Sequence, residues 1–217
     1  MARPQLHLIT DSRRPLELLL EVLSAAVAGG VDVVQVRDKI ASPAALVALT
    51  RQVHAAVAGR ALVIVNGAVE IALQAGADGV HLPEGHADLA GARRTLGAAA
   101  YIGVSVHGVA AARRAEQAGV SSVTFGHIYA TGSHVGEPPR GLGALREVVA
   151  AVRVPVVAVG GIDVGRIPEV MAAGAAGVAV ISAIINANEP GEATRGVRQA
   201  LDAGANSFAK QWRDGDA

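Results

Sequence analysis

The chain has 217 residues, with 19 basic and 19 acidic side chains and no cysteine. A net charge of zero argues against recruitment of nucleic acid or of an anionic membrane surface. The lack of cysteine excludes disulfides, thiolate metal sites and a cysteine nucleophile. Hydrophobic residues make up 51% of the chain but aromatic residues only 2%, so the core must be built from Ala, Val, Leu and Ile. Such a core suits parallel strands that are buried on both faces.

The first residues lead into a short strand without the apolar core of a signal peptide. No apolar stretch reaches membrane-spanning length without glycine or charge. We therefore expect a soluble cytoplasmic protein with small-molecule ligands and neither a nucleic-acid nor a membrane partner. The sequence leaves the oligomeric state open, homo-oligomers included.

Short apolar runs alternate with Ala-rich helical stretches along the whole chain. We expect strands at 6–10, 31–37, 61–66, 79–82, 101–106, 122–126, 154–160 and 177–181. We expect helices after Pro15, at about 43–57, through 70–73, at about 87–96, at 110–118, from near Asp163, and at about 192–203. This alternation implies right-handed crossovers and a parallel sheet.

Four of the predicted helices end in Ala-Gly turns, within residues 28–31, 75–78, 118–120 and 173–175. Each turn places glycine where a left-handed residue is needed before the next strand. Eight strand–helix units favour a closed (β/α)₈ TIM barrel over an open doubly wound sheet. The predicted organisation is one α/β domain over residues 1–205, followed by a flexible tail over 206–217.

His127 follows the sixth predicted strand and opens a long, turn-rich loop. In a strand–helix barrel, a side chain at the C-terminal tip of a strand faces the mouth of the active site. A histidine there can give and take protons near neutral pH, which makes His127 a candidate catalytic residue. The alternative is a histidine that caps the strand by hydrogen bonding.

Polar side chains also gather at the end of the second predicted strand. Strand alternation puts Gln35, Arg37 and Lys39 on one side, with Val34 and Val36 facing the helices. We expect the three polar chains to point into the barrel mouth. A buried Arg–carboxylate layer inside the barrel is the alternative.

The seventh and eighth predicted strands end in Gly160-Gly161 and in Ser182-Ala183. Phosphate sites of these barrels are often built after strands seven and eight from backbone N–H groups. Glycine lets the backbone approach an anion closely, and Ser182 can add a hydroxyl donor. With the cationic second strand, this pattern favours a phosphorylated small molecule, although Gly160-Gly161 can also be a simple tight turn.

Five segments in register carry a resemblance to a known superfamily: 8–11 (Leu-Ile-Thr-Asp), 35–39 (Gln-Val-Arg-Asp-Lys), 76–82 (Gly-Ala-Asp-Gly-Val-His-Leu), 103–107 (Gly-Val-Ser-Val-His) and 159–162 (Val-Gly-Gly-Ile). The chain resembles, over nearly its whole length, the superfamily of thiamine phosphate synthases and TenI-like thiazole tautomerases. The resemblance implies a (β/α)₈ barrel that acts on thiazole phosphates in thiamine biosynthesis.

The chain departs from the synthase pattern at three places. A synthase has Asn-Asp after the third strand and a second Asp after the fourth, both of which help to bind magnesium; this chain has Asn66-Gly67 and, at 83–86, Pro-Glu-Gly-His. The synthase loop after the sixth strand usually contains a lysine that grips diphosphate. Here residues 130–134 read Ala-Thr-Gly-Ser-His. Glu84 or Asp88 could still hold a metal in an altered way.

The positions of His127 and of Asn66-Gly67 look like the tautomerase branch. That resemblance implies a cofactor-independent and metal-independent isomerase that converts a thiazole carboxylate phosphate to its aromatic tautomer. His127 would move both protons, Gly160, Gly161, Ser182 and Ala183 would hold the phosphate, and Arg37 or Lys39 would meet the carboxylate. Asn66 and Ser105 would line the site.

Two other functions remain open from the sequence. The first is a magnesium-dependent thiamine phosphate synthase, which joins a pyrimidine diphosphate to the thiazole. The second is a non-catalytic regulator that binds thiazole or thiamine phosphates. The roles of His107 and His134, and closure of the loop at 128–140 over a ligand, are likewise open.

Overall fold

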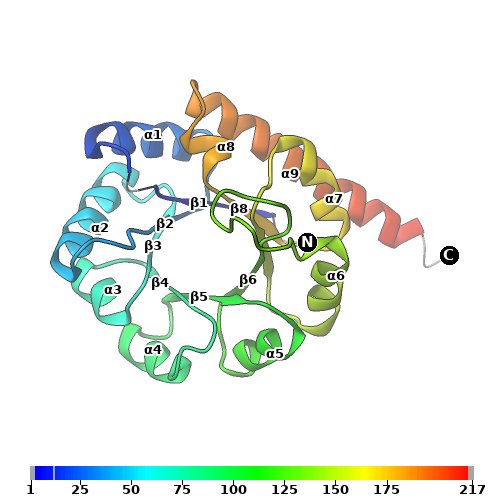
Figure 1. Ribbon diagram of the computed structural model, residues 1–217, viewed down its shortest axis with the longest axis horizontal. Helices are drawn as coiled ribbons and strands as arrows, with labels where there is room; N and C mark the ends of the chain where they lie inside the picture. The colour runs from blue at the N-terminus through cyan, green and yellow to red at the C-terminus, as the bar shows by residue number, and fades with distance from the viewer. Residues whose placement is uncertain (1–2, 12, 215–217) are drawn as a thin grey trace.

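The computed structural model describes residues 3–11 and 13–214 and forms a closed barrel of parallel strands ringed by helices (Figure 1). The strands pair in chain order, and β8 returns to β1 to close the barrel. Their bounds are β1 Gln5–Ile9, β2 Val33–Val36, β3 Leu62–Asn66, β4 Gly79–Leu82, β5 Tyr101–Val106, β6 Ser122–Gly126, β7 Val156–Val159 and β8 Gly177–Val180. The predicted TIM barrel is confirmed.

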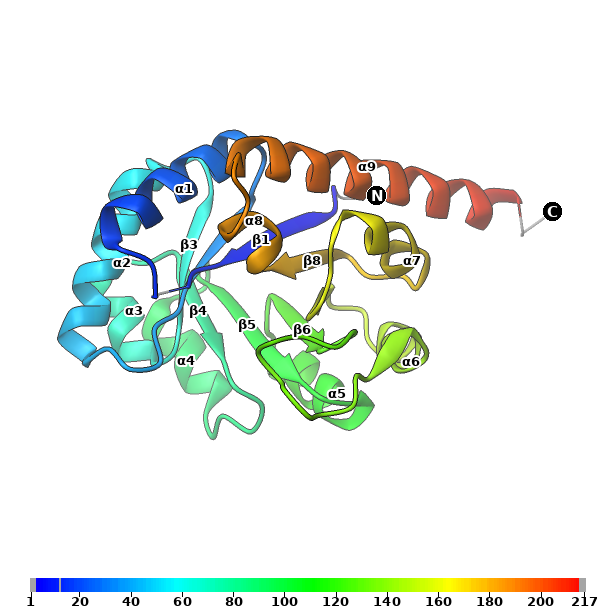
Figure 2. The ribbon, with the colours of Figure 1, turned by 45° about the horizontal axis from the view of Figure 1, so that its top comes forward.

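The helices lie outside the strands and bury their apolar faces against them (Figure 1). Their bounds are α1 Leu16–Ala28, α2 Pro43–Val57, α3 Val69–Ala75, α4 Leu89–Leu96, α5 Val109–Gln117, α6 Gly141–Ala151, the 3₁₀ helix η1 Val164–Arg166, α7 Ile167–Ala172, α8 Ser182–Ile185 and α9 Pro190–Asp214. α6 and α8 are absent from the expected helices. α9 packs against α1, α7 and α8 and then extends past the barrel (Figure 2).

Local signals account for many of the element boundaries. Ser42 caps α2, where its hydroxyl accepts a hydrogen bond from the N–H of Ala45, and Pro43 begins the helix. The four Ala-Gly turns each contain a glycine with positive φ; at Gly76, for example, φ is 68°. This is the left-handed geometry that the sequence predicts at these turns.

Several element boundaries differ from the predicted ones, most of them by one or two residues, and two of the differences concern the second strand and the last helix. The second strand is shorter than expected because Arg37 already leaves the ladder: its N–H donates to the Thr10 side chain, Oγ1, at 2.9 Å. The last helix continues from Pro190 to Asp214, through most of the stretch predicted as a tail, while residues 215–217 of that stretch lie outside the described residues. That the domain ends at 205 and that 206–217 form a flexible tail stay predictions.

Candidate active site

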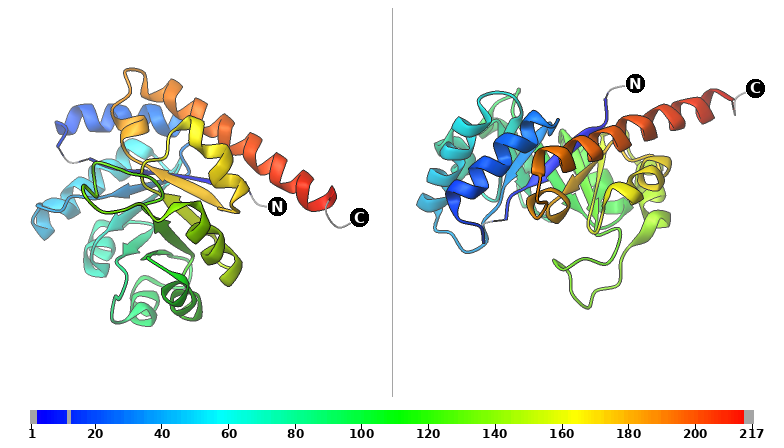
Figure 3. Two further views of the ribbon diagram at one scale, coloured as in Figure 1. Left: turned by 45° about the vertical axis from the view of Figure 1, so that its right-hand side comes forward. Right: turned by 90° about the horizontal axis from the view of Figure 1, so that it is seen from above.

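The C-terminal ends of the strands open on one face of the barrel, which is turned toward the viewer in Figure 1. The loop between β6 and α6 is on this side and projects away from the strands (Figure 3, right). The candidate residues at the strand ends are therefore brought to one mouth, as this fold requires. The contacts of each group show what it is free to do.

Gln35 points into the barrel, as strand alternation predicts, and is only 1% exposed. Its amide nitrogen lies 3.3 Å from Nδ1 of His7, and its amide oxygen accepts a hydrogen bond from the Asn66 amide at 3.2 Å. These bonds join β1, β2 and β3 across the interior. Asn66 therefore lies at the mouth, with its amide N–H committed to fixing Gln35.

Two buried histidines extend this polar interior. His81 Nε2 lies 2.9 Å from the Ser105 hydroxyl. Burial lowers the pKa of His81 to about 4, and burial together with the nearby His81 lowers the pKa of His7 to about 3. Both rings are therefore neutral at pH 7 and act as hydrogen-bonding groups. Sequence reasoning gave these histidines no role, although both stand at inward positions of their strands.

Arg37 and Lys39 lie just beyond β2. Two hydrogen bonds to the Thr10 hydroxyl fix the backbone of Arg37. The N–H of Arg37 donates to it, and the carbonyl of Arg37 accepts from it at 3.1 Å. The Arg37 side chain is half-buried and Lys39 is exposed, so both charges keep contact with water at the mouth. This placement differs from the alternative of an Arg–carboxylate layer inside the barrel.

His127 is 3% exposed and packed against its own loop. Its ring stacks on that of His134 with centroids 4.5 Å apart, and its Nε2–H donates to the carbonyl of Glu137 at 3.3 Å. Burial, followed by the nearby His127, lowers the pKa of His134. The ring of His127 thus organises the loop, which resembles the capping alternative more than a free proton carrier.

Arg140, which sequence reasoning missed, fastens the far end of this loop. Its Nε donates to the carbonyl of Gly126 at 3.0 Å, and its Nη1 donates to the carbonyl of His107 at 3.1 Å. The backbone N–H of Arg140 also donates to the carbonyl of His127 at 2.9 Å. The loop is consequently tied at both ends to the tips of β5 and β6.

Gly160 and Gly161 have positive φ angles of 100° and 65°. A Cβ on Gly160 would lie 2.3 Å from Cβ of His127, and one on Gly161 would lie 2.6 Å from the carbonyl oxygen of Ala130. Glycine is therefore required here by the loop after β6 as well as by the turn. This requirement would exist with or without a bound anion.

The backbone around these residues still offers donors. Within the described part of the chain, no acceptor takes a hydrogen bond from the N–H groups of Gly160, Gly161, Ser182 or Ala183. These residues follow the neighbouring strands β7 and β8, and each is at least partly exposed. Their N–H groups can therefore reach an anion at the mouth.

The two places where the resemblance puts magnesium ligands do not fit that ion. Gly67 and His86 supply no carboxylate, and the carboxylates nearby have other partners. Glu84 lies 2.5 Å from Nδ1 of His107. Asp88 caps α4 by accepting from the N–H of Gly91 at 2.6 Å, and pairs with Arg94 at 3.2 Å. Magnesium needs several oxygen ligands in octahedral array, which these side chains do not provide.

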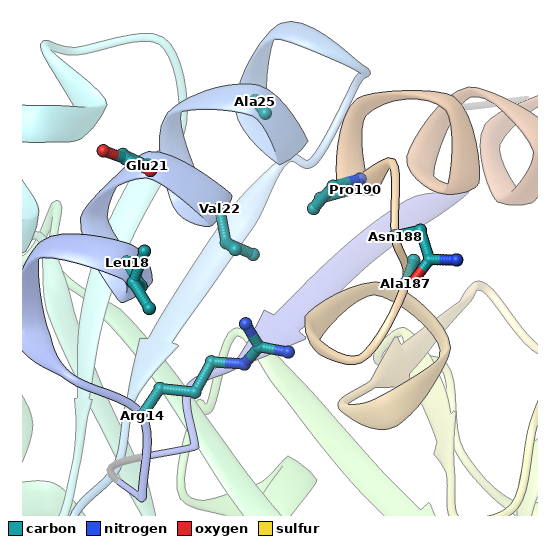
Figure 4. Close-up of a pocket in the computed structure, with 8 residues that line it drawn as sticks. All are labelled: Arg14, Leu18, Glu21, Val22, Ala25, Ala187, Asn188 and Pro190. Carbon is teal, nitrogen blue, oxygen red and sulfur yellow. The ribbon is translucent and has the colours of Figure 1, made fainter.

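A separate hollow of about 270 Å³ lies outside the barrel, between α1 and the link from α8 to α9. Figure 4 shows the guanidinium of Arg14 turned toward Pro190 and Asn188, with Leu18 and Val22 on the opposite wall. None of the residues predicted for the active site lines it.

In the described residues, no helix combines the length and apolarity needed to cross a bilayer.

The fold is a (β/α)₈ barrel with backbone N–H donors at its mouth after β7 and β8. The family described as thiamine monophosphate synthase (TMP-TENI) matches residues 6–184. The chain belongs to this family. The expected superfamily is thus confirmed at that level.

Individual relatives point to one branch. The thiamine-phosphate synthase of Anaeromyxobacter dehalogenans (strain 2CP-C) is 42% identical over 181 residues, covering 83% of this chain and 82% of the relative. A putative thiamine-phosphate synthase of Geobacter sulfurreducens is 44% identical over 195 residues, covering 88% and 91%. Among solved structures, thiamine phosphate pyrophosphorylase from Pyrococcus furiosus matches with a TM-score of 0.82 and 31% identity, covering 93% and 96%.

These relatives overturn the expected thiazole tautomerase and with it the isomerase class. The tautomerase interpretation rested on Gly67, His86 and the lysine-free loop as departures from synthases, yet proteins 42% and 44% identical to this chain bear the synthase name, one of them as putative. It also rested on His127 as a proton shuttle. The structure gives that ring a packing partner in His134 and a hydrogen-bond partner in Glu137. The expectation of a metal-independent reaction loses its basis together with the tautomerase.

Proposed function

We propose that this protein is a thiamine phosphate synthase, a transferase that joins a pyrimidine diphosphate to a thiazole phosphate and releases diphosphate. The observation that carries the proposal is the set of backbone N–H groups after β7 and β8, at Gly160, Gly161, Ser182 and Ala183, which have no acceptor in the described part of the chain. The synthase names of relatives more than 40% identical support the same reaction.

Different residues of the mouth bind the two anionic substrates. The N–H groups of Gly160, Gly161, Ser182 and Ala183 bind a phosphate, with the Ser182 hydroxyl as a further donor. Arg37 and Lys39 follow β2, which only β1 separates from β8, and they bring positive charge to a place where a leaving diphosphate needs stabilisation. The departing diphosphate carries more negative charge in the transition state than in the bound substrate. Arg37 and Lys39 therefore stabilise the transition state more than the substrate, which speeds bond breaking.

The polar groups beneath the mouth hold the substrates in place. Asn66 and Ser105 line the floor, and each is fixed by a hydrogen bond to a buried partner, Gln35 or His81. A floor whose donors are already oriented brings the two substrates together at a smaller entropic cost. His127 belongs to the wall formed by the β6–α6 loop.

The direct test is to supply the purified protein with the pyrimidine diphosphate and the thiazole phosphate and to measure thiamine phosphate by its conversion to a fluorescent product. We expect turnover that ceases when either substrate is omitted. Formation of no thiamine phosphate under any choice of divalent ion would overturn the proposal.

The absence of carboxylates at Gly67 and His86 favours one second candidate, a regulator that binds thiamine or thiazole phosphates without turning them over. A regulator would bind thiamine phosphate in equilibrium dialysis while failing the turnover assay. An enzyme would pass both tests, so the two measurements separate the candidates.

A further inference from the structure

The side chains of His127, His134 and Glu137 form a cluster in the β6–α6 loop that the proposed reaction does not use. Their ligand-type atoms all lie within 4.8 Å of one another. Within the part of the chain that the structure describes, this is the one group of three or more His, Cys, Asp or Glu side chains that converge in this way. Two imidazoles and one carboxylate are a donor set suited to zinc and its neighbours in the first transition row.

We propose that His127, His134 and Glu137 bind one divalent transition-metal ion, of the zinc class, at the rim of the barrel mouth. The inference concerns a metal site and holds whichever reaction the mouth carries out. It places the ion beside β6, on side chains other than those at positions 67 and 86, where the resemblance leads one to look for magnesium.

The three ligands differ in how firmly they are held. His127 is 3% exposed, and its Nε2–H bond to the carbonyl of Glu137 fixes the ring, so it is the anchor of the site. A hydrogen bond from a ligand ring to a backbone carbonyl is a usual support of metal-bound histidine. His134 and Glu137 are exposed, and both lie on the same loop within ten residues of His127.

Binding requires a small closure of the loop. A tetrahedral zinc ion with bonds of about 2.0–2.1 Å brings its ligand atoms to about 3.4 Å from one another, closer than the present limit of 4.8 Å. The rings of His127 and His134 are now nearly parallel, at 17°, so His134 must rotate out of the stack to aim a nitrogen at the ion. Both exposed side chains have the freedom to make this movement.

The site has a mechanical consequence for the mouth. The backbone of the loop is already tied to the strand tips through Arg140, whereas its central part, 130–136, contains several exposed residues. An ion shared by His127 and the central His134 joins that central part to β6. Three protein ligands also leave coordination positions for water or for an anion in the mouth.

The experiment uses the full chain, freed of metal by dialysis against a chelator, and Co²⁺ as a spectroscopic probe. We expect one Co²⁺ per chain with the visible absorption of a low-symmetry site, displaced by Zn²⁺ but not by a large excess of Mg²⁺. Zn²⁺ is then measured by calorimetry in His134→Ala and Glu137→Gln. Because even outer partners of metal ligands change affinity by about 10–100-fold, loss of a ligand should weaken Zn²⁺ by at least about 100-fold.

Two matched variants serve as controls. His54→Ala removes a partly exposed histidine on α2, and Glu147→Gln removes an exposed carboxylate on α6, each outside the cluster. Both should bind Zn²⁺ like the wild type. As a second measurement, Zn²⁺ should slow hydrogen exchange of residues 128–137 in the wild type and leave it unchanged in His134→Ala.

Three results would overturn the metal site: no stoichiometric Co²⁺ or Zn²⁺ binding, equal affinity in the ligand and control variants, or displacement of Zn²⁺ by Mg²⁺. Absence of Zn²⁺ binding by the wild-type protein, together with normal thiamine phosphate formation, would contradict the metal site alone. Stoichiometric Zn²⁺ binding without turnover would contradict the proposed reaction alone.

Discussion

Gly160 and His127 face each other at the tips of β7 and β6 so closely that a single added carbon would not fit. A Cβ on Gly160 would lie 2.3 Å from Cβ of His127, and the φ of Gly160 is 100°. The glycine expected to approach a phosphate is thus also the surface on which His127 rests. The turn at Gly160-Gly161 and the β6–α6 loop therefore pack directly against each other.

Gly160→Ala should consequently destabilise the fold. Positive φ in alanine and a forced contact with Cα and Cβ of the buried His127 each cost about 1–3 kcal/mol, so the free energy of unfolding should fall by about 2–6 kcal/mol. Urea unfolding followed by circular dichroism measures the change. Gly143→Ala is the matched control, because its Cβ meets nothing within 4 Å and its backbone is helical. The control should be neutral or slightly stabilising, and equal losses in the two variants would show that the contact is unimportant.

A negative charge placed beside the phosphate donors should weaken anion binding without weakening the fold. Ala183 is partly exposed in the first turn of α8 and its N–H has no acceptor in the described residues, so Ala183→Asp introduces a repulsive carboxylate there. We expect the affinity for thiamine phosphate to fall at least about tenfold, the equivalent of 1.4 kcal/mol. The neutral Ala183→Asn should bind nearly as well as the wild type. Unchanged affinity in the Asp variant would place the phosphate elsewhere.

The eight strand–helix units were sufficient to predict the barrel, and side-chain alternation along the second strand was sufficient to predict the inward direction of Gln35, because both follow from short-range patterns. Contacts between loops could not be predicted in this way. Glu84 and His107 are 23 residues apart, and Arg140 reaches back to the carbonyl of His107 across 33 residues. Such partners become visible only when the strand ends are assembled into one rim.

The tautomerase interpretation failed for a related reason. It treated Gly67 and His86 as signs of a different reaction, although a missing side chain says which ligand is absent and nothing about what replaces it. It also preferred His127 as a proton carrier over the alternative of a histidine that caps the strand by hydrogen bonding. In the folded chain, His127 has His134, Glu137 and Gly160 around it.

The buried histidines should make stability depend on pH. Their folded-state pKa values, about 3 for His7 and about 4 for His81, lie below the value of about 6.5 expected in the unfolded chain. Between those limits the unfolded chain binds more protons, so stability rises with pH and is lost as pH falls from about 6.5 toward 4. With both rings in this window, the free energy of unfolding should fall by about 2–3 kcal/mol per pH unit.

Urea unfolding at a series of pH values between about 7 and about 4.5 measures this slope. His81→Gln removes one of the two protons and should roughly halve the slope contributed by the pair. A slope that is the same in wild type and His81→Gln would contradict the neutral buried ring.

Position 67 offers a way to restore a carboxylate where the resemblance to synthases implies one. A Cβ on Gly67 would lie 3.7 Å from the Val65 side chain and 3.8 Å from that of Leu46, which are ordinary contacts, and its φ is not in the left-handed region. Gly67→Asp should therefore fold with a melting temperature close to that of the wild type. The new carboxylate follows β3 directly and has the hard oxygen atoms that Mg²⁺ prefers.

We expect thiamine phosphate formation by the Gly67→Asp variant to reach half its maximum at a lower Mg²⁺ concentration than in the wild type. Gly67→Asn is the matched control, since it has the same shape without the charge and should show no such shift. An equal Mg²⁺ requirement in Gly67→Asp, Gly67→Asn and the wild type would show that a carboxylate at this place does not meet the ion, and that the metal chemistry of this chain lies elsewhere on the rim.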